Sequence, residues 1–502
     1  MIQYPYRSAP YTGFKYLTYF GRIVPFTSAR QTFIDAAAFV CGIPQRITNR
    51  ERRIRQWRQK MTVLDERRPP HSRFAQSERR VPRRAVVAAI AGNALEFYDF
   101  GIYSFFAVYA ARAFFPSLDG LTGILASVAV FGVGFVTRPL GALLIGRLGD
   151  RLGRKPALLL TITLIIVGTM GLALTPDQAT IGVAAPIIVV ISRLIQGFGL
   201  GGEVGPAVAF LMEAAPEGRR GFYTSWSTAS QGISNFAAGI VGVTFTSLLA
   251  PESMQSWGWR LAFALGLLLV PVALYLRRQM PETFDGRSRG ANTTDTPWRD
   301  LWRHRRAILA GMAMLGASTA VFYVAIYMTT YSIAVLKMPP HIGMFSAIVL
   351  GASLIVFGLL GGWLCDRYNV RVIVALPYTV LLAGIYPAYH LLILSQSVPT
   401  LLIATVLMSA MPAVGGPSVL MLIGEALPAR VRALGLSVTY AVPITIFGGT
   451  AQVVVTWLLK HTGNPASPAF YAVMASAVML FAIMAFPKGL DRFGHADGIV
   501  LD

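Results

Sequence analysis

Long apolar stretches separated by short polar connections dominate the chain from Arg84 onward. A run of about 20 apolar residues is the length that a helix needs to cross the hydrocarbon core of a membrane. Lipid offers no hydrogen-bond partner to an open strand, so such runs favour helices. The pattern predicts an all-α membrane protein with twelve transmembrane helices. These cover residues 85–112, 121–146, 156–175, 181–212, 220–249, 258–277, 306–335, 343–364, 371–393, 398–424, 433–459 and 467–486.

The basic residues of the connections predict the orientation of these helices. One set of connections holds 20 Lys and Arg residues, whereas the opposite set holds only Arg112, Arg260, Lys337 and Lys460. Cytoplasmic loops accumulate positive charge, so the first set is predicted to face the cytoplasm. With an even number of helices, both termini and the loop at 278–305 are expected on that side.

Two segments of the sequence occur twice. Residues 146–155 are echoed by 362–371 at an offset of 216, and residues 213–216 are echoed by 425–428 at an offset of 212. Two echoes at nearly one offset indicate a duplicated six-helix unit of one orientation. We therefore predict two parallel halves, with a linker between them and short tails outside. The predicted boundaries are 1–83 for the N-terminal tail, 84–277 for the first half, 278–305 for the linker, 306–487 for the second half and 488–502 for the C-terminal tail.

The composition excludes a soluble enzyme, and the distribution of charge argues against a nucleic-acid partner. Hydrophobic residues make up 54% of the chain and charged residues 13%, with a mean hydropathy of +0.56, whereas soluble domains carry about 25% charged residues. The net charge of +21 would by itself suggest a polyanionic partner. However, residues 1–84 contribute +13 of it and residues 85–502 only +8. The lipid bilayer is the expected macroscopic partner, and we expect a monomer.

The basic tail at residues 1–83 has no apolar segment typical of a signal peptide followed by a cleavage site. Basic residues between Arg46 and Arg58, interleaved with Ile47, Ile54 and Trp57, could form an amphipathic helix on anionic lipid. A plainer hypothesis is that translation starts at Met61 and that residues 1–60 are not part of the mature protein.

Two carboxylates lie deep in the first predicted helix. Glu96 and Asp99 lie roughly 18 and 22 Å from its start at 1.5 Å per residue, near the middle of the membrane. With Tyr103 they form one polar stripe. An ionisable group inside a bilayer is costly and usually functional, so at least one of the pair is a candidate proton carrier. The alternative is that one of them only neutralises an Arg within the first half.

Arg138 and Arg193 are the two basic residues deep within the predicted helices. A guanidinium presents a planar fork of donors that fits a carboxylate, so an anionic substrate could complete its pairing. Gln196 and Glu203 share a helix face with Arg193; Gln196 is a further substrate contact and Glu203 a further proton carrier. The alternative is a permanent salt bridge, Arg193 with Glu203 or Arg138 with Asp99.

Other polar residues in the apolar runs are candidate pocket contacts. Tyr323, Tyr327 and Tyr331 recur at every fourth position of the seventh predicted helix, a stripe that core packing explains nearly as well. Gln231, Asn235 and Gln452 are also candidates. Gly197–Gly202 matches a dinucleotide-binding spacing, but it lies inside an apolar helix with no preceding strand, so we interpret it as close helix packing.

No cofactor or metal is expected. The two cysteines, Cys41 and Cys365, are too few for a thiolate site or a disulfide framework. The six histidines are isolated from one another, and no phosphate-cradling motif of an ATP-driven pump occurs. A constellation for an intramembrane enzyme is not evident.

Several motifs resemble those of a known family. Residues 146–155 and Arg193-Leu194-Ile195-Gln196-Gly197 resemble two signatures of the major facilitator superfamily. Residues 92–100, Arg138-Pro139-Leu140-Gly141 and residues 221–226 resemble the metabolite:H+ symporter family within it. Residues 221–226, together with Phe322-Tyr323 and Thr330-Tyr331, look most like its citrate/tricarballylate branch. The likeness covers about residues 84–488. It implies a major facilitator fold and a cytoplasmic gate in which the signature Asp caps or pairs with a neighbouring helix. The gate residues would be Asp150, Arg151, Arg154, Glu213, Asp366, Arg367 and Glu425.

Together these features predict a secondary transporter that carries a small organic anion, a di- or tricarboxylate such as citrate, with protons by alternating access. A proton symporter for a zwitterionic osmolyte or a neutral metabolite is the first alternative. A membrane receptor that binds without transporting is the alternative from another class.

Overall fold

The computed structural model describes most of the chain from residue 83 onward and two short strands near the N-terminus. The described ranges are 16–19, 22–25, 83–152, 154–201, 211, 214–216, 218–278, 301–428 and 432–487. The chain divides into two units, residues 1–79 and 80–502. The predictions for the amphipathic helix, for Met61, for most of the linker and for the tail at 488–502 lie outside the described residues.

The described part of the first unit is a pair of short antiparallel strands. Strand β1 (Tyr16–Tyr19) pairs with β2 (Arg22–Pro25), with Tyr16 opposite Pro25 and Tyr19 opposite Arg22. These strands are an addition to the all-helical prediction.

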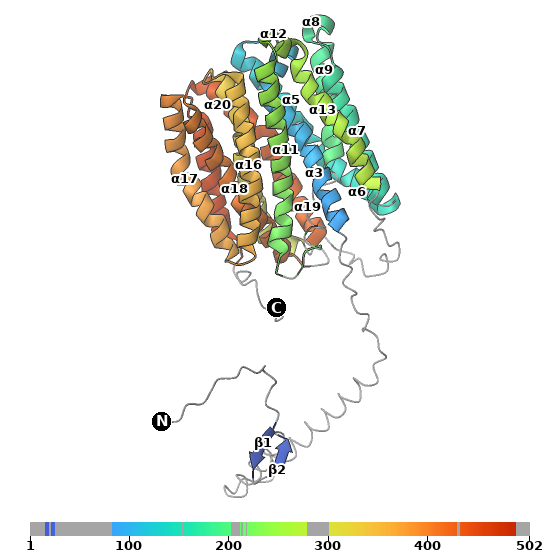
Figure 1. Cartoon of the computed structure of the whole chain (residues 1–502), viewed down its shortest axis with the longest axis vertical. Helices are drawn as coiled ribbons and strands as arrows, with labels where there is room; N and C mark the ends of the chain where they lie inside the picture. Colours follow the sequence, from blue (N-terminus) through green and yellow to red (C-terminus); the bar gives the residue numbers. More distant parts are fainter. Residues whose placement is uncertain are drawn as a thin grey trace, which may run out of the picture. The chain divides into compact units, whose positions relative to one another are not determined.

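The second unit is helical throughout its described residues, and its first half contains helices α3 to α13 (Figure 1). They are α3 (Arg83–Phe105), α4 (Ala107–Phe114), α5 (Gly120–Val136), α6 (Arg138–Leu152), α7 (Arg154–Leu174), α8 (Gln178–Ile181), α9 (Ala184–Leu200), α11 (Arg220–Leu248), α12 (Pro251–Ser253), the π-helix η1 (Met254–Gly258) and α13 (Trp259–Arg278).

The second half contains helices α15 to α21. They are α15 (Arg305–Ala334), α16 (Pro340–Cys365), α17 (Val370–Ser395), α18 (Val398–Ala426), α19 (Arg432–Pro443), the π-helix η3 (Ile444–Gly448), α20 (Gly449–Thr462) and α21 (Ser467–Ala485). Each of the twelve predicted apolar stretches falls on one or more helices of the two halves, as the apolar pattern predicts.

Seven helical spans among the described residues are long and apolar enough to cross a membrane. They are Gly120–Ile145, Arg305–Ala334, Pro340–Cys365, Val370–Ser395, Val398–Ala426, Gly435–Thr462 and Ser467–Ala485. Two shorter apolar helices cover Leu159–Leu174 and Ala184–Leu200.

The distribution of side chains is inverted relative to a soluble protein. Large apolar side chains lie on the outside, where Leu394 of α17 and Phe481 of α21 are each 70% exposed. Charged and amide side chains lie inside, where Arg193 and Gln196 are fully buried. An apolar exterior suits a surface in contact with lipid, and buried polar groups in such a protein mark functional sites.

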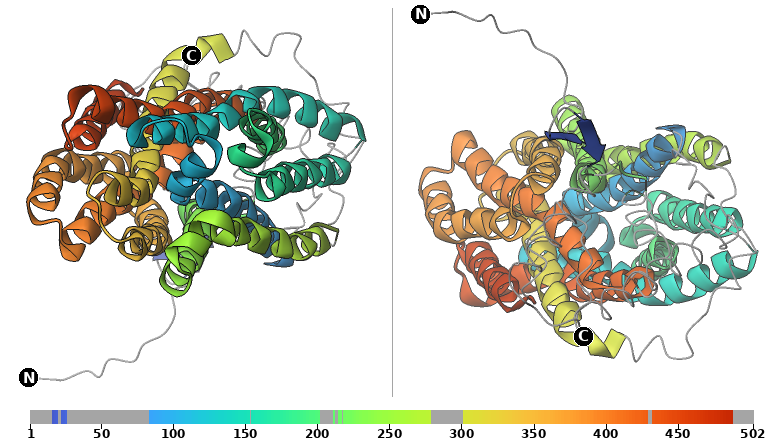
Figure 2. Two further views of the ribbon diagram at one scale, coloured as in Figure 1. Left: turned by 90° about the horizontal axis from the view of Figure 1, so that it is seen from above. Right: turned by 90° about the horizontal axis from the view of Figure 1, so that it is seen from below.

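The two halves meet along specific helix pairs. Viewed end-on, the orange and red helices α17 and α21 lie on the opposite side of the bundle from the teal helices α7 and α9 (Figure 2). Between them, α11 of the first half packs along α16 of the second, and α5 packs along α20.

Residues 197–202 include the glycines that match a dinucleotide-binding spacing, and Gly197 lies within α9. A Cβ atom at Gly197 would clash with the carbonyl oxygen of Gly134 in α5. The glycine therefore permits close contact between two helices, as interpreted from the sequence.

Candidate functional site

A buried polar network joins three helices of the first half. Asp99 of α3 is 5% exposed, and its Oδ2 accepts hydrogen bonds from Thr169 Oγ1 of α7 at 2.7 Å and from Gln196 Nε2 of α9. Gln196 Oε1 in turn accepts a hydrogen bond from the Arg193 guanidinium at 2.5 Å. The neutral amide of Gln196 therefore bridges a buried carboxylate and a buried guanidinium.

Both ends of this bridge carry unused hydrogen-bonding groups. Among the described residues, Asp99 Oδ1 has no donor, and Arg193 Nε and one of its terminal nitrogens have no acceptor. Buried charges are normally paired and hydrogen-bonded, because taking an ion out of water costs several kcal/mol. An acceptor and two donors without partners in one network are suited to bind a ligand and a proton reversibly.

Aromatic rings enclose the two guanidinium groups. Arg193 Cζ lies 3.8 Å from the ring centre of Tyr103, and the Tyr103 hydroxyl donates to the carbonyl of Ser127. Arg138 Cζ lies 3.9 Å from the ring centre of Phe135 and 4.5 Å from that of Phe100. Cation–π contacts of this kind contribute roughly 0.5–2 kcal/mol each, which offsets only part of the cost of burial.

Arg138 opens α6 at a break in the second membrane-spanning segment. Helix α5 ends at Val136, and Thr137 Oγ1 donates to the carbonyl of Leu194 in α9 at 2.8 Å. The guanidinium of Arg138 also forms a hydrogen bond with Tyr323 of α15. Arg138 therefore links the first half to the second.

A small cavity lies between the halves beside this aromatic cluster. It is lined by Phe97, Phe100, Gly101, Phe131, Asn235, Phe322, Tyr323 and Ile326 and has a volume of about 10 Å³. That volume holds about one water molecule. This cavity is thus too small for an organic metabolite, and binding one there requires helices of the two halves to separate.

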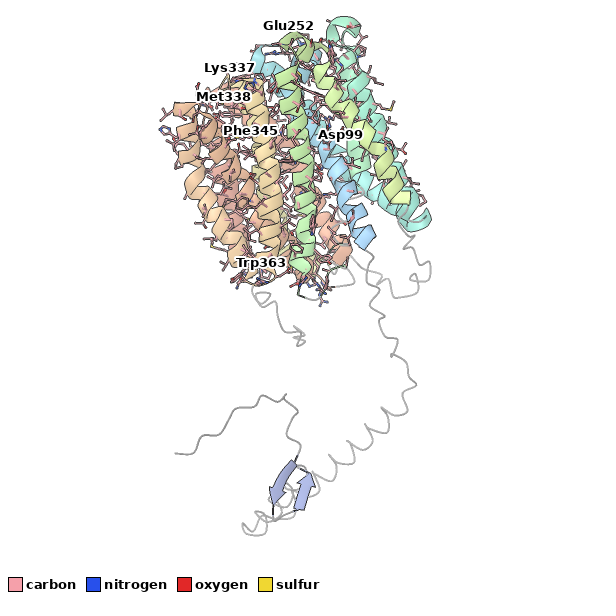
Figure 3. The ribbon with its side chains drawn as sticks, viewed as in Figure 1. Asp99, Glu252, Lys337, Met338, Phe345 and Trp363 are labelled. Atoms are coloured by element: carbon pink, nitrogen blue, oxygen red, sulfur yellow. The ribbon has the colours of Figure 1, made fainter. Side chains whose placement is uncertain are left out.

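Asp99 lies midway between the two ends of the helical unit. Figure 3 shows Asp99 between the end that carries Trp363 and the end that carries Glu252 and Lys337. The carboxylate therefore lies at the depth expected of the middle of a membrane.

A second polar contact joins the halves at the Trp363 end. The carboxylate of Asp366, just after α16, accepts hydrogen bonds from the backbone N–H groups of Gly221 at 2.6 Å and Phe222 at 2.9 Å. These N–H groups belong to the first turn of α11, so Asp366 caps a helix of the other half. We call this contact between Asp366 and the start of α11 the latch.

Comparison with known proteins decides the family. The sequence profile of the Major Facilitator Superfamily matches residues 89–387. The chain belongs to the major facilitator superfamily.

The relatives of this superfamily member are bacterial transporters. It is 32% identical to a citrate-proton symporter of Klebsiella pneumoniae, over 79% of this chain and 90% of that protein. It is 34% identical to an alpha-ketoglutarate permease of Escherichia coli K12, over 83% and 97% of the two chains. Among solved structures, a D-xylose-proton symporter superposes with a TM-score of 0.68 at 18% identity, covering 81% of this chain and 98% of that one. The chain is an integral membrane protein with the major facilitator fold of two six-helix halves.

The candidate site residues of this superfamily member fall into three groups. Asp99, Arg193 and Gln196 form the bridged network, with Tyr103 stacked on Arg193. Tyr323 and Asn235 line the cavity, and the Gln231 backbone carbonyl accepts from Asn235 Nδ2 at 2.7 Å. Tyr327 does not line the cavity. Its hydroxyl accepts a hydrogen bond from Thr456 Oγ1 at 3.0 Å.

Several predicted residues lie outside the described part of the structure. Glu203 and Glu213 are among the residues that the structure does not describe. Four further residues lie on described helices, but their side chains do not belong to the described part: Glu96, Asp150, Arg151 and Arg154. Their roles stay predictions.

The other predicted gate residues lie near the latch. Arg367 stacks on Trp363, with Cζ 4.0 Å from the ring centre, and half-buried Glu425 lies near the end of α18. Burial raises the pKa of the Asp366 carboxyl, although the hydrogen bonds from Phe222 and Gly221 and the charges of Arg219 and Arg367 oppose the rise. The latch is therefore expected to hold best at low pH and to weaken as the pH rises through this raised pKa.

Sequence reasoning missed two hydroxyl residues of the site. Thr169 Oγ1 contacts Asp99 but also lies 2.9 Å from the carbonyl of Ile165 in its own helix. Ser104 Oγ accepts from Gln452 Nε2 of α20 at 2.7 Å, which joins the halves. Hydroxyl side chains in membrane helices commonly bond their own backbone, so the sequence alone carries no signal for such roles.

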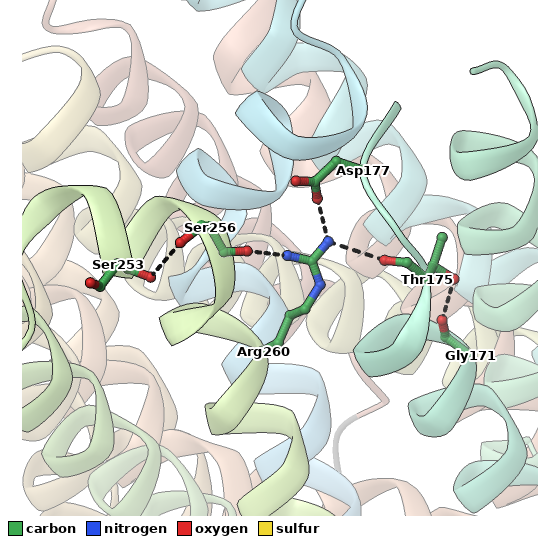
Figure 4. Close-up of polar contacts among 6 residues, drawn as sticks. All are labelled: Gly171, Thr175, Asp177, Ser253, Ser256 and Arg260. Carbon is green, nitrogen blue, oxygen red and sulfur yellow. Dashed lines mark hydrogen bonds and ion pairs between the residues drawn. The ribbon is translucent and has the colours of Figure 1, made fainter. Parts of the chain in front are cut away.

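An arginine at the end of the unit opposite the latch provides a contrast with the buried Arg193. Arg260 of α13 forms an ion pair with Asp177 and donates to the carbonyls of Ser256 at 2.5 Å and Thr175 at 3.1 Å (Figure 4). Its side chain is 18% exposed. Both terminal nitrogens of Arg260 thus have protein partners, so Arg260 serves as a control for substitutions of Arg193.

Replacing Asp366 by Ala is expected to open the latch end more often. Loss of a helix cap costs about 1 kcal/mol, which corresponds to about a fivefold change in an equilibrium constant. Ser225, one turn into α11, is fully buried and faces Gly362 of α16. In a chain whose two native cysteines are replaced by Ser, a cysteine at position 225 should react with a maleimide about fivefold faster when Asp366 is Ala.

The matched control is Asp119→Ala at the other end of the unit. Asp119 caps α5 by accepting from the N–H of Thr122 at 2.8 Å, so this substitution removes the same kind of contact without touching the latch. Equal labelling rates in the Asp366→Ala variant and in its parent would show that Asp366 does not hold the two halves together.

Proposed function

We propose that this protein is a proton-coupled symporter of a small organic anion, a di- or tricarboxylate, that works by alternating access. The observation that carries the proposal is the network of Arg193, Gln196 and Asp99. Within the described residues it contains a fully buried guanidinium with two open donors and a carboxylate with one open oxygen.

The open donors of Arg193 support a carboxylate as the substrate. A guanidinium pairs bidentately with a carboxylate, and such charge-assisted hydrogen bonds are stronger than neutral ones. Arg138, in the same aromatic cluster, offers a second cation for a second carboxylate. The named substrates of the two relatives, citrate and alpha-ketoglutarate, carry three and two carboxylates and support the same class.

The open oxygen of Asp99 supports a coupling of proton movement to anion movement. Oδ2 already accepts two hydrogen bonds, so Oδ1 is the position at which a proton can be held without displacing a donor. An anion that binds Arg193 adds negative charge next to Asp99 in a medium of low dielectric constant. Uptake of a proton by Asp99 compensates that charge, which couples the two movements.

The latch supplies the two-state element that alternating access requires. A contact between halves that is made in one conformation and broken in the other biases their equilibrium. We further propose that the latch end, which is rich in Arg, faces the cytoplasm together with both termini. The site lies within a single chain, in keeping with a monomer in the bacterial inner membrane, and transport without chemical conversion needs no catalytic group.

A second candidate substrate is a zwitterion with one carboxylate. The rings of Phe97, Phe100, Phe131 and Tyr323 around the cavity could hold an ammonium group by cation–π contacts.

Ligand-induced thermal stabilisation distinguishes these substrates. At 100-fold excess over its Kd, a ligand stabilises the folded state by about 2.7 kcal/mol. We expect dicarboxylates and tricarboxylates to raise the unfolding temperature of the purified protein, and monosaccharides to leave it unchanged. Stabilisation by betaine or proline alone would favour the second candidate, and stabilisation by none of these compounds would contradict both.

A further inference from the structure

The side chain of Asn235 has a fixed orientation in the middle of α11. It is 1% exposed, and its Nδ2 donates to the carbonyl oxygen of Gln231 at 2.7 Å. Rotating the amide by 180° would place two oxygens against each other, so the assignment of Oδ1 and Nδ2 follows from this hydrogen bond. The Oδ1 atom therefore points away from its own helix and into the space between α11 and α3.

That oxygen faces the cavity without a hydrogen bond. In the ranges that the structure describes, no donor reaches Asn235 Oδ1. The other side chains that line the cavity are aromatic or aliphatic, apart from the Tyr323 hydroxyl, which is engaged by Arg138. A buried acceptor left unsatisfied costs about 1–3 kcal/mol, so its presence in an apolar cavity indicates a ligand that supplies a donor.

Gly101 of α3 keeps the space in front of the oxygen open. A Cβ atom at position 101 would lie 3.1 Å from Asn235 Oδ1 and 3.4 Å from the ring of Phe105. A small group of the substrate can occupy this space, whereas any side chain at 101 would fill it.

A fully ionised carboxylate cannot satisfy this acceptor, because it has no hydrogen to donate. Its natural partners are Arg193 and Arg138, whose guanidinium groups both lie over the ring of Phe100. Phe100, which lines the cavity, therefore connects two cationic groups suited to carboxylates with a separate acceptor, suited to a donor elsewhere on the carbon skeleton.

We propose that Asn235 is a specificity residue that accepts a hydrogen bond from a hydroxyl group of the transported acid, so that the carrier prefers hydroxycarboxylates to the same acids without the hydroxyl. This inference rests on the proposed function. A site built around a hydrogen bond to a substrate hydroxyl rejects the analogue that lacks it, because the polar group of the site is then left unpaired.

Paired substrates test the inference in proteoliposomes that contain the full chain. Malate with succinate, and citrate with tricarballylate, are pairs that differ by one hydroxyl group. We expect the wild type to have a KM at least about tenfold lower for the hydroxylated member of a pair. In Asn235→Leu, which keeps the branched shape and the number of heavy atoms but removes the acceptor, the ratio of the two KM values should fall to about one while uptake of the deoxy acid persists.

A second variant and a control distinguish a change in specificity from a loss of folded protein. Gly101→Ala keeps Asn235 but narrows the space before it, so it should raise the KM for the hydroxylated acid and leave that for the deoxy acid within about twofold. Asn93→Leu removes another buried amide of the α3–α11 interface, whose Nδ2 donates to Ser230 Oγ at 2.6 Å and to the carbonyl of Ser227. This control should keep the wild-type ratio of the two KM values, whatever it does to the amount of folded protein.

The outcomes separate this inference from the function on which it rests. A wild type that moves all four acids with equal KM, or an Asn235→Leu variant that keeps the wild-type ratio, overturns the role of Asn235 alone. A wild type that moves none of the four acids overturns the proposed function and this inference with it.

Discussion

Replacing Arg193 by Gln is expected to abolish uptake of organic anions. Arg193 is fully buried on α9, and it holds two donors that no described residue accepts. Gln keeps a polar side chain that can reach Gln196 but removes the charge and the bidentate fork. Truncating one partner of a buried charge pair costs about 2–5 kcal/mol, so we expect the affinity for the anion to fall by about 30-fold to about 5,000-fold in equilibrium binding.

The control for this prediction is Arg260→Gln. The same change of residue removes an ion pair with Asp177, whose side chain is 37% exposed, and partly exposed pairs contribute at most about 1 kcal/mol. Affinity for the anion should stay within about twofold of the wild type. If Arg193→Gln binds the anion as tightly as Arg260→Gln does, Arg193 only orders the helix bundle and does not bind substrate.

Replacing Asp99 by Asn is expected to separate substrate movement from proton movement. The Asn side chain has the same shape, and its oxygen can accept from Thr169 and Gln196 as Asp99 Oδ2 does. The network is thereby kept, but no group remains at position 99 that binds and releases a proton. A pH gradient of one unit supports about tenfold accumulation for each coupled proton, and this accumulation should disappear while exchange of labelled for unlabelled anion continues.

Asp177→Asn is the matched control, because it makes the same chemical change in the ion pair with Arg260. It should accumulate the anion as the wild type does. Accumulation by Asp99→Asn in response to a pH gradient would mean that another carboxylate carries the proton, and Glu96, one helical turn away on α3, would be the first to test.

The sequence predicts the helices well because the bilayer restricts the choices. Apolar runs of sufficient length can only be helices in lipid, and their order follows from the short connections. The helical period also places Arg193 and Gln196 side by side on α9, since they are three residues apart. Hence two of the three members of the network could be found together from spacing alone.

Sequence spacing does not predict which residues of different helices contact each other. The salt bridge considered between Arg193 and Glu203 stays a prediction, because Glu203 lies outside the described residues. Asp99 contacts Arg193 only through Gln196, which lies between them. The tyrosine stripe on α15 shows the same limit. Tyr323 lines the cavity, but the Tyr331 hydroxyl donates to the carbonyl of Pro465 at 2.7 Å, because neighbouring helices cover different parts of one stripe.

The contact made by Asp366 does not depend on the rest of the repeated signature. Tyr368-Asn369-Val370 departs from the first copy of the signature. The contact with α11 requires only the carboxylate and two backbone N–H groups. Its geometry therefore tolerates the changes that follow Asp366 in the sequence.

The most direct test of proton-coupled anion transport is a measurement of proton movement in proteoliposomes with a lightly buffered external medium. Addition of citrate or succinate should make the medium more alkaline in proportion to the anion taken up, in the wild type but not in Asp99→Asn. Uptake of the anion by the wild type with no accompanying change of external pH would contradict the account.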